Sequence, residues 1–164
     1  MKALVIFVCL ALSFRTAHQH NTGCFPTNWK HRWVRVNANL WLTQLDTRRP
    51  WHEQAIKCLS IEKGTNFARA DSKEVQSVIA HRFDNDVWLA GYEIGNSGAW
   101  YWYGRGPHLC GTERIISSAW SPSARPDAGK HSTMHCMVNR NVGYKGWYYA
   151  SCMDSKKAVC ELKC

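Results

Sequence analysis

The sequence lacks the short motifs that mark the common hydrolase, zinc and redox classes. It contains no HExxH, no GxSxG and no CxxC pair, which argues against a zinc metalloprotease, an α/β-hydrolase, a zinc ribbon and a thioredoxin-like redox site. No pair of carboxylates stands in a recognisable acid–base context. We therefore expect a protein that is not an enzyme.

Long apolar runs and repeats are also missing. After the first residues, no segment approaches the roughly 20 apolar residues that a membrane helix requires, and there are no internal repeats or low-complexity linkers. Lys2 followed by an apolar run over residues 3–14 is typical of an export signal. We expect a signal peptide over residues 1–17, cleaved between 13 and 17, and hence a secreted, extracellular protein with no membrane span.

Acidic residues are in the minority. The chain has 21 Lys and Arg against 12 Asp and Glu, and loss of Lys2 and Arg15 with the signal leaves 19 against 12. This excess favours anionic partners such as acidic glycans, acidic extracellular proteins or mineral surfaces, although a merely solvated basic surface is the alternative. Only two adjacent basic pairs occur, Arg48-Arg49 and Lys156-Lys157. Such scatter argues against a nucleic-acid partner.

Seven cysteines remain once Cys9 is assigned to the signal. They are Cys24, Cys58, Cys110, Cys136, Cys152, Cys160 and Cys164. In an exported protein this set predicts a disulfide framework. The odd number leaves one thiol free or bonded between chains.

Local patterns predict two helices. Pro50 starts the first, over residues 51–59, where Trp51, Ala55, Cys58 and Leu59 share one face at helical spacing. Asp71 or Ser72 caps the second, whose apolar stripe runs from Val75 to Phe83. Strands are expected at residues 33–36, 40–43, 87–92, 136–139 and 158–162. Residues 96–130 show little periodicity, and an irregular stretch of this length is usually functional.

A series of landmarks follows in a fixed order. They are Ala55 and Cys58, Val87-Trp88-Leu89-Ala90-Gly91, Gly98-Ala99-Trp100-Tyr101-Trp102 with Gly106, Trp120-Ser121-Pro122, Arg125-Pro126-Asp127, Cys136, Trp147, Cys152 and Val159-Cys160-Glu161. This order resembles the C-type lectin-like domain family over about residues 24–161. The resemblance implies one domain over residues 24–164 with an α+β, C-type lectin-like fold: two helices, small antiparallel sheets and a long irregular loop, stapled by disulfides.

The same resemblance implies the disulfide pairing. It pairs Cys58 with Cys160 and Cys136 with Cys152. Because the termini of this family lie side by side, it also favours a bond between Cys24 and Cys164. Cys110, in the long loop, then remains for an interchain link, and hence for a disulfide-linked homodimer.

The residues at the family's calcium site depart from its pattern. Calcium-dependent members hold the ion with a Glu-Pro-Asn or Gln-Pro-Asp triplet and a later Trp-Asn-Asp, whereas this chain has Arg125-Pro126-Asp127 and Trp147-Tyr148-Tyr149. Calcium prefers six to eight oxygen ligands, several of them carboxylates. We therefore expect no calcium and no other cofactor. Pro126 is either the family's cis-proline or an ordinary turn proline.

Aromatic and basic residues dominate what remains. Trp100 and Trp102 share one strand face, which the resemblance places in the core. The candidate ligand-binding residues are Tyr101, Tyr103, Tyr148, Tyr149, Arg114, Arg125, Pro126 and Asp127. Tyrosine rings can stack on sugars, and arginine can bind sulfate or carboxylate with two hydrogen bonds. His131 and His135 have a spacing that suits zinc, but the surrounding sequence is loop-like and we expect no metal site there.

These observations predict a secreted C-type lectin-like protein that binds anionic glycans without the usual calcium site. The alternative is a structural or interaction protein of an extracellular matrix, coat or biomineral. A membrane-active defence protein fits less well, because no basic amphipathic stretch is present.

Overall fold

The computed structural model describes residues 25–95, 97–104, 113–115, 120, 134–140 and 146–164. The predicted signal peptide, Cys24, Cys110 and Arg125 to Asp127 lie outside these residues. The elements are β1 (Trp33–Asn37), β2 (Leu40–Arg49), α1 (Trp51–Leu59), β3 (Thr65–Phe67), α2 (Lys73–Arg82), β4 (Val87–Glu93), β5 (Trp100–Trp102), β6 (His135–Arg140), β7 (Gly146–Ser151) and β8 (Lys156–Lys163). Among the described residues, no helix is long and apolar enough to cross a membrane.

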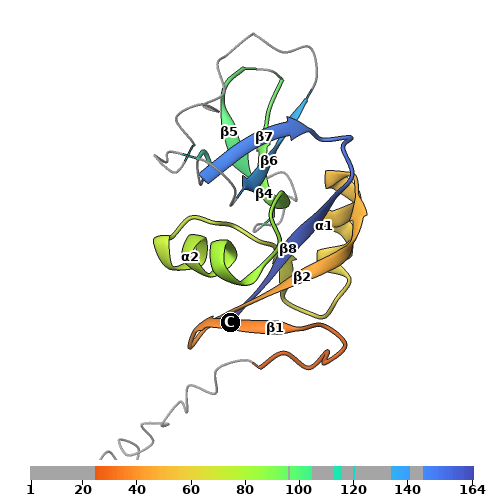
Figure 1. The fold of residues 1–164 in the computed structure, drawn as a ribbon, viewed down its shortest axis with the longest axis vertical. Helices are drawn as coiled ribbons and strands as arrows, with labels where there is room; N and C mark the ends of the chain where they lie inside the picture. Colours follow the sequence, from red (N-terminus) through yellow and green to blue (C-terminus); the bar gives the residue numbers. More distant parts are fainter. Residues whose placement is uncertain (1–24, 96, 105–112, 116–119, 121–133, 141–145) are drawn as a thin grey trace, which may run out of the picture.

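The strands form one sheet in the order β1-β2-β8-β4-β6-β7, with β3 paired to β8 and β5 paired to β4. All the pairs are antiparallel except β4 with β8, which meet in parallel where Trp88 faces Ala158. This parallel contact joins the two antiparallel parts. One part, with β1, lies at the end of the molecule that also holds the C-terminus, and the part with β5, β6 and β7 lies at the other end (Figure 1).

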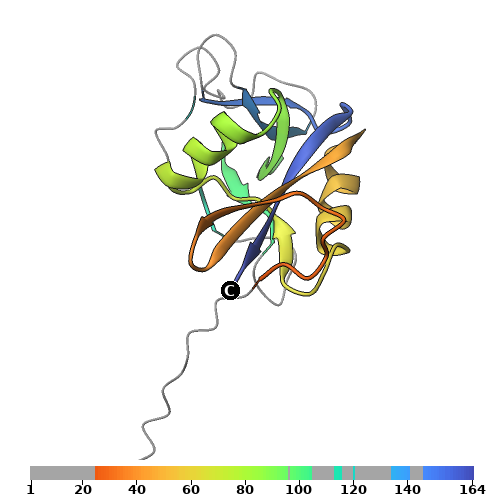
Figure 2. The same cartoon turned by 60° about the horizontal axis from the view of Figure 1, so that its bottom comes forward.

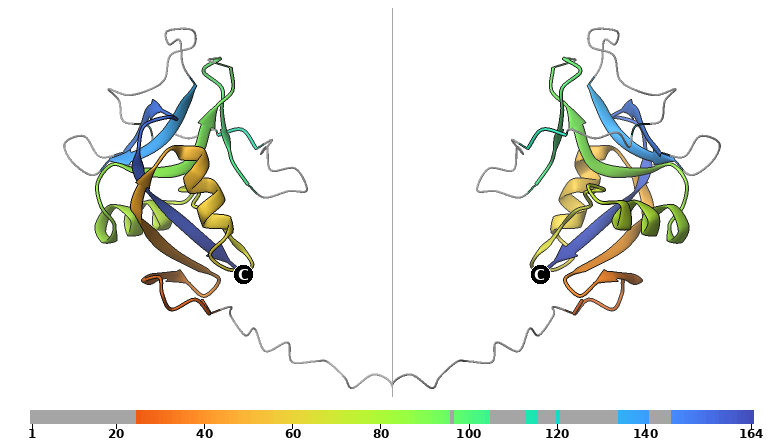
Figure 3. Two further views of the ribbon diagram at one scale, coloured as in Figure 1. Left: turned by 90° about the vertical axis from the view of Figure 1, so that its right-hand side faces the viewer. Right: turned by 90° about the vertical axis from the view of Figure 1, so that its left-hand side faces the viewer.

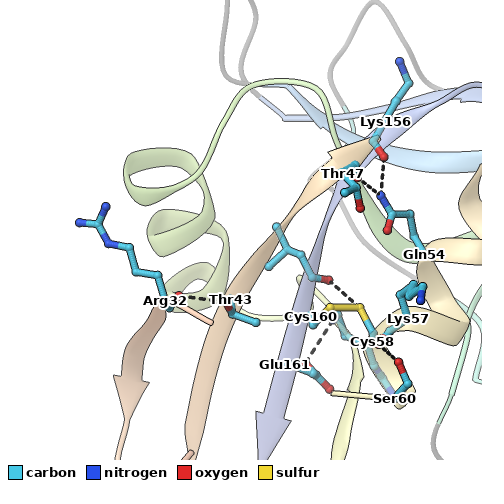
Figure 4. Close-up of a disulfide and its surroundings, with 12 residues drawn as sticks. Arg32, Thr43, Thr47, Gln54, Lys57, Cys58, Ser60, Lys156, Cys160 and Glu161 are labelled. Carbon is cyan, nitrogen blue, oxygen red and sulfur yellow. Dashed lines mark hydrogen bonds between the residues drawn. A yellow bond between two sulfur atoms is a disulfide. The ribbon is translucent and has the colours of Figure 1, made fainter. Parts of the chain in front are cut away.

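The first helix has the predicted bounds, 51–59, and starts after Pro50. It lies along β8 (Figure 3) and buries Trp51, Ala55 and Cys58. Leu59, at the end of the predicted apolar face, is 37% exposed, whereas the polar Gln54 is buried. The Gln54 amide nitrogen donates to the carbonyls of Thr47 and Lys156, at 2.7 and 2.6 Å, and so ties α1 to the ends of β2 and β8 (Figure 4). These bonds satisfy the buried amide nitrogen of Gln54.

The second helix begins where Ser72, rather than Asp71, caps it. The Ser72 hydroxyl accepts a hydrogen bond from the Val75 backbone N–H at 3.2 Å. Val75 and Ile79 are buried, and Phe83 packs against the core from the end of the helix. Helices α1 and α2 lie on opposite sides of β2 and β8 (Figure 2). The predicted α+β class is therefore confirmed.

Two disulfides agree with the predicted pairing. Cys58 on α1 bonds Cys160 on β8, and Cys136 on β6 bonds Cys152 just after β7 (Figure 4 shows the first). Cys164 is also disulfide-bonded. Its predicted partner, Cys24, lies outside the described residues.

Candidate functional site

A cluster of tryptophans lies under the β5–β7 end of the domain. The Trp102 and Trp147 rings meet edge to face at 5.5 Å, and Trp120 bridges them to Trp100, with ring centroids 5.8 Å from Trp147 and 4.7 Å from Trp100. Trp100, Trp102 and Trp147 are buried, so the prediction that the Trp100–Trp102 pair belongs to the core is confirmed. The long-loop residue Trp120 is thus held on a rigid aromatic base.

Two indole groups of this cluster are buried. The ring N–H groups of Trp100 and Trp147 have no acceptor within the part of the chain that the structure describes. A buried donor without a partner costs about 1–3 kcal/mol.

A buried polar pair lies beside the tryptophans. Glu93, the last residue of β4, accepts a hydrogen bond from the Gly98 backbone N–H at 2.7 Å, and its other oxygen lies 3.1 Å from Nδ1 of His135. The His135 ring contacts Tyr149 edge to face at 5.0 Å. Within the described part of the chain, no three His, Cys, Asp or Glu side chains are grouped to hold a metal ion. The sequence did not indicate this pair, because its members are 42 residues apart.

The two tyrosines that follow Trp147 point to opposite faces of β7. Tyr149 lies on the tryptophan face, with its ring centroid 6.5 Å from that of Trp100. Tyr148 lies on the other face, where the Arg140 guanidinium stands 4.6 Å from the ring centroid. Both rings are half-buried. Alternation along a strand makes this separation unavoidable.

The remaining described candidates lie around β5. Tyr101 pairs with the exposed Arg114 in an isolated antiparallel bridge, which places the two on the same face. Tyr103 packs edge to face on Trp51 at 5.2 Å and joins the core. β4 and β6 lie between β5 and β7, so the strands that carry Tyr101 and Tyr148 are about 14 Å apart, and the register sets Tyr101 in line with Ala150 rather than with Tyr148. The structure thus brings Tyr101 and Arg114 together, but neither Tyr148 nor Tyr149 joins them.

An ion pair that the sequence did not reveal anchors the start of the described loop segment. Arg69 is nearly buried and donates two hydrogen bonds to the Glu113 carboxylate, at 2.7 and 2.6 Å, and its guanidinium lies 5.4 Å from the Trp102 ring centroid. The Asp71 carboxylate lies 3.2 Å from the same guanidinium. Burial opposes the charged form of Arg69, but the bond to Glu113 and the nearby carboxylates outweigh it and raise the arginine pKa.

A second ionic group ties β4 to β8 and β6. Asp86 lies 2.7 Å from the Lys156 ammonium and 3.2 Å from Arg140. Burial by itself raises the pKa of Asp86, yet the hydrogen bonds and charges of these two cations outweigh it and hold that pKa below its ordinary value. Arg140 therefore contacts both the Asp86 carboxylate and the ring of Tyr148.

Comparison with known proteins supports the fold alone. No protein-family model and no curated protein sequence matches the chain. Among solved structures, the C-type lectin CEL-I from Cucumaria echinata is 17% identical, with a TM-score of 0.65, over 85% of this chain and 97% of that one. Ovocleidin-17, a major protein of the Gallus gallus eggshell calcified layer, is 17% identical, with a TM-score of 0.61, over 87% and 100%.

A third similar structure is a calcium-independent type II antifreeze protein, which is 21% identical, with a TM-score of 0.66, over 88% of this chain and 98% of that one. Among the described residues, two helices, a mixed sheet and the Cys58–Cys160 and Cys136–Cys152 bonds define a disulfide-stapled α+β domain. Its similarity to these three structures over most of the chain shows that this domain has the C-type lectin-like fold. The three are a lectin, an eggshell protein and an antifreeze protein, so the fold by itself leaves the ligand undecided.

Proposed function

We propose that this chain is a secreted, non-enzymatic binding protein that recognises anionic glycans without calcium. The observation that carries the proposal is the chemistry of β7. After the buried Trp147, the positions where the family resemblance implies calcium ligands hold Tyr148 and Tyr149. Neither residue supplies a carboxylate, and a cation, Arg140, already stands against Tyr148 at 4.6 Å.

These residues do not fit a calcium ion. Calcium needs several carboxylate or carbonyl oxygens around one point. Tyr148 and Tyr149 face away from each other, and the neighbouring Glu93 is engaged with Gly98 and His135. The similarity to an antifreeze protein described as calcium-independent agrees with a use of this fold that does not require the ion.

The charge of the chain supports an anionic partner. Its formal net charge is +9, and Arg114 is exposed beside Tyr101 at the β5 edge. A guanidinium next to a half-buried ring can hold a sulfate or carboxylate while the ring contacts the sugar. Arg125, predicted from the sequence, would add a second guanidinium in the long loop.

A glycan array that includes sulfated and sialylated glycans, probed with and without a calcium chelator, tests this proposal. We expect binding to acidic glycans that the chelator leaves unchanged. Arg114→Ala and Arg125→Ala should weaken it, whereas Arg82→Ala, which removes an exposed charge from α2, should not. Chelator-sensitive binding to neutral sugars would refute the proposal.

A second candidate is a structural protein of a matrix, coat or mineralised layer. The similarity to ovocleidin-17, an eggshell protein, favours it. The same array separates the two candidates, because a scaffold of this kind should bind no glycan. Such a scaffold should instead adsorb through its basic surface to a mineral such as calcium carbonate, which is measured in parallel.

A further inference from the structure

The segment before β1 is built as a firmly bonded turn at the end of the molecule opposite β5, β6 and β7 (Figure 1). The Glu62 carboxylate accepts hydrogen bonds from the Thr27 backbone N–H at 2.9 Å, from the Thr27 hydroxyl and from the Asn28 N–H at 3.3 Å. Asn28 donates from its side chain to the carbonyl of Ile61, and its own carbonyl accepts from the Trp33 indole at 3.1 Å. The turn is therefore fixed to the loop after α1.

This turn presents large aromatic side chains to solvent. Trp29 is 75% exposed and Phe25 is 60% exposed, although both lie in a segment held by the bonds just described. Phe25 packs on the Trp41 ring of β2, with centroids 5.9 Å apart. A fixed segment whose largest side chain faces water is typical of a surface that binds a partner.

A preorganised cation completes the surface. Arg35 of β1 pairs with Trp41 across the β1–β2 ladder, and its guanidinium lies 5.7 Å from the Trp41 ring centroid. Its Nε donates to the Asn37 carbonyl at 3.1 Å, which limits the rotamers open to it. Lys30, next to Trp29, adds a second exposed charge. We name this set the Trp29 surface: Phe25, Trp29, Lys30, Arg35 and Trp41.

The surroundings of the Trp29 surface are free of acidic sequence. Residues 1–45 contain no Asp or Glu. Two carboxylates lie close by: Glu62 accepts hydrogen bonds from the base of the turn, and Glu74 accepts one from the Asn37 side chain at 3.2 Å. Among the described residues, no carboxylate forms an ion pair with Lys30 or Arg35. The charges of Lys30 and Arg35 are therefore not used in ion pairs and can meet an anion.

We propose that the Trp29 surface is a binding site for a sulfated polysaccharide. The flat faces of exposed aromatic rings can stack on pyranose rings, and the guanidinium and ammonium groups can bind the sulfates between them. The site lies at the opposite end of the domain from Arg114 and Tyr101. It is independent of the proposed function at the loop end.

The arrangement favours a polysaccharide over a lipid bilayer or a protein. Lys30 directly follows Trp29 and the Arg35 guanidinium lies against the Trp41 ring, so charged groups adjoin the rings, unlike in an apolar tip that enters a membrane. Arg35 is held by Trp41 and Asn37, so it loses little side-chain entropy when it binds an anion of defined geometry. A diffuse layer of headgroups would gain less from a fixed guanidinium.

The test uses the full secreted chain and heparin as the probe. We expect Trp29→Ala and Lys30→Gln/Arg35→Gln each to weaken heparin binding about tenfold, a loss of ~1.4 kcal/mol. Trp29→Phe should retain most of the affinity, because an aromatic face remains. The double charge variant should also reduce the salt dependence of binding.

Matched variants control for charge and exposed apolar area. Arg32→Gln/Arg82→Gln removes two exposed charges, and Figure 4 shows the Arg32 side chain pointing toward the α2 side, away from α1. Met153→Ala removes an exposed apolar side chain elsewhere. Both controls should bind heparin within about twofold of the wild type, since neither changes the Trp29 surface.

Spectroscopy locates the site without relying on affinity. The indole N–H resonance of Trp29, identified by its absence in Trp29→Ala, should shift when heparin is added, also in an Arg114→Ala background. An unchanged Trp29 resonance during saturable heparin binding would overturn the proposal. So would equal losses in the control variants, or Trp29-dependent binding to phosphatidylserine vesicles without binding to heparin. If Arg114→Ala loses heparin binding while the variants of the Trp29 surface keep it, the polysaccharide binds beside Arg114 and Tyr101 and the proposal is wrong.

Discussion

Replacing Glu113 with glutamine should destabilise the domain and loosen the segment of residues 113–115. Arg69 is 6% exposed, and two of its nitrogens bond the Glu113 carboxylate. The Glu113→Gln variant keeps the size of the side chain but removes its charge and one acceptor. The nearly buried guanidinium then loses its closest counter-ion.

The magnitude follows from the burial of the two partners. Breaking a fully buried pair costs about 3–5 kcal/mol, and an exposed pair is worth about 0–1 kcal/mol. Glu113 is 66% exposed, and Asp71 remains 3.2 Å from Arg69. We therefore expect a loss of ~1–2 kcal/mol in the free energy of unfolding, measured by urea denaturation with the disulfides intact.

Hydrogen exchange should localise the effect. The Trp102 N–H donates to the Glu113 carbonyl at 3.1 Å, and the Ile115 N–H donates to the Trp100 carbonyl at 2.8 Å. Both amides should exchange faster in Glu113→Gln, because the anchor of this segment is weakened. Asp154→Asn, which removes an exposed charge elsewhere, serves as the control. If Glu113→Gln matches that control in stability and exchange, Arg69 does not hold the loop.

Three further predictions concern the sheet and its disulfides. Cys58→Ala/Cys160→Ala opens a loop with a sequence separation of 102 residues and should cost about 4–5 kcal/mol in thermal or urea unfolding; a loss below about 1 kcal/mol would contradict this. Although burial opposes it, the Lys156 ammonium lowers the Asp86 pKa, so the unfolded state binds more protons and stability falls as the pH drops below about 4. Urea midpoints measured from neutral pH down through this range should fall more for the wild type than for Asp86→Asn, and parallel curves would refute the assignment. Gly91→Ala should cost about 1–3 kcal/mol, because its Cβ would lie 2.5 Å from a buried methionine side chain of β6; an unchanged urea midpoint would show that the sheet can relax.

Much of the fold was predictable because its signals are local. Pro50 and the apolar spacing that follows it predicted α1, and Ser72 with Val75 marked the start of α2. The order of cysteine and tryptophan landmarks predicted the Cys58–Cys160 bond before any distance was known. Such signals depend on residues near one another in the chain or on a spacing that the whole family shares.

The candidate site was less predictable because it depends on pairings between distant residues. Glu93 with His135, and Arg69 with Glu113, are 42 and 44 residues apart, and nothing local marks them as partners. The β3 strand and the strand character of β7 were also missed. Short strands gain their stability from the neighbours that they pair with rather than from their own sequence.

The sequence by itself determined the class of protein, a C-type lectin-like, disulfide-stapled α+β domain, and that Tyr148 and Tyr149 follow Trp147. Only the tertiary structure decided which side chains meet. Tyr148 and Tyr149 lie on opposite faces of one strand, and Tyr101 lies beside Arg114. Trp29 is exposed on a firmly bonded turn. Composition and order along the chain record what residues are present, whereas sheet register and burial set which of them share a face and reach solvent.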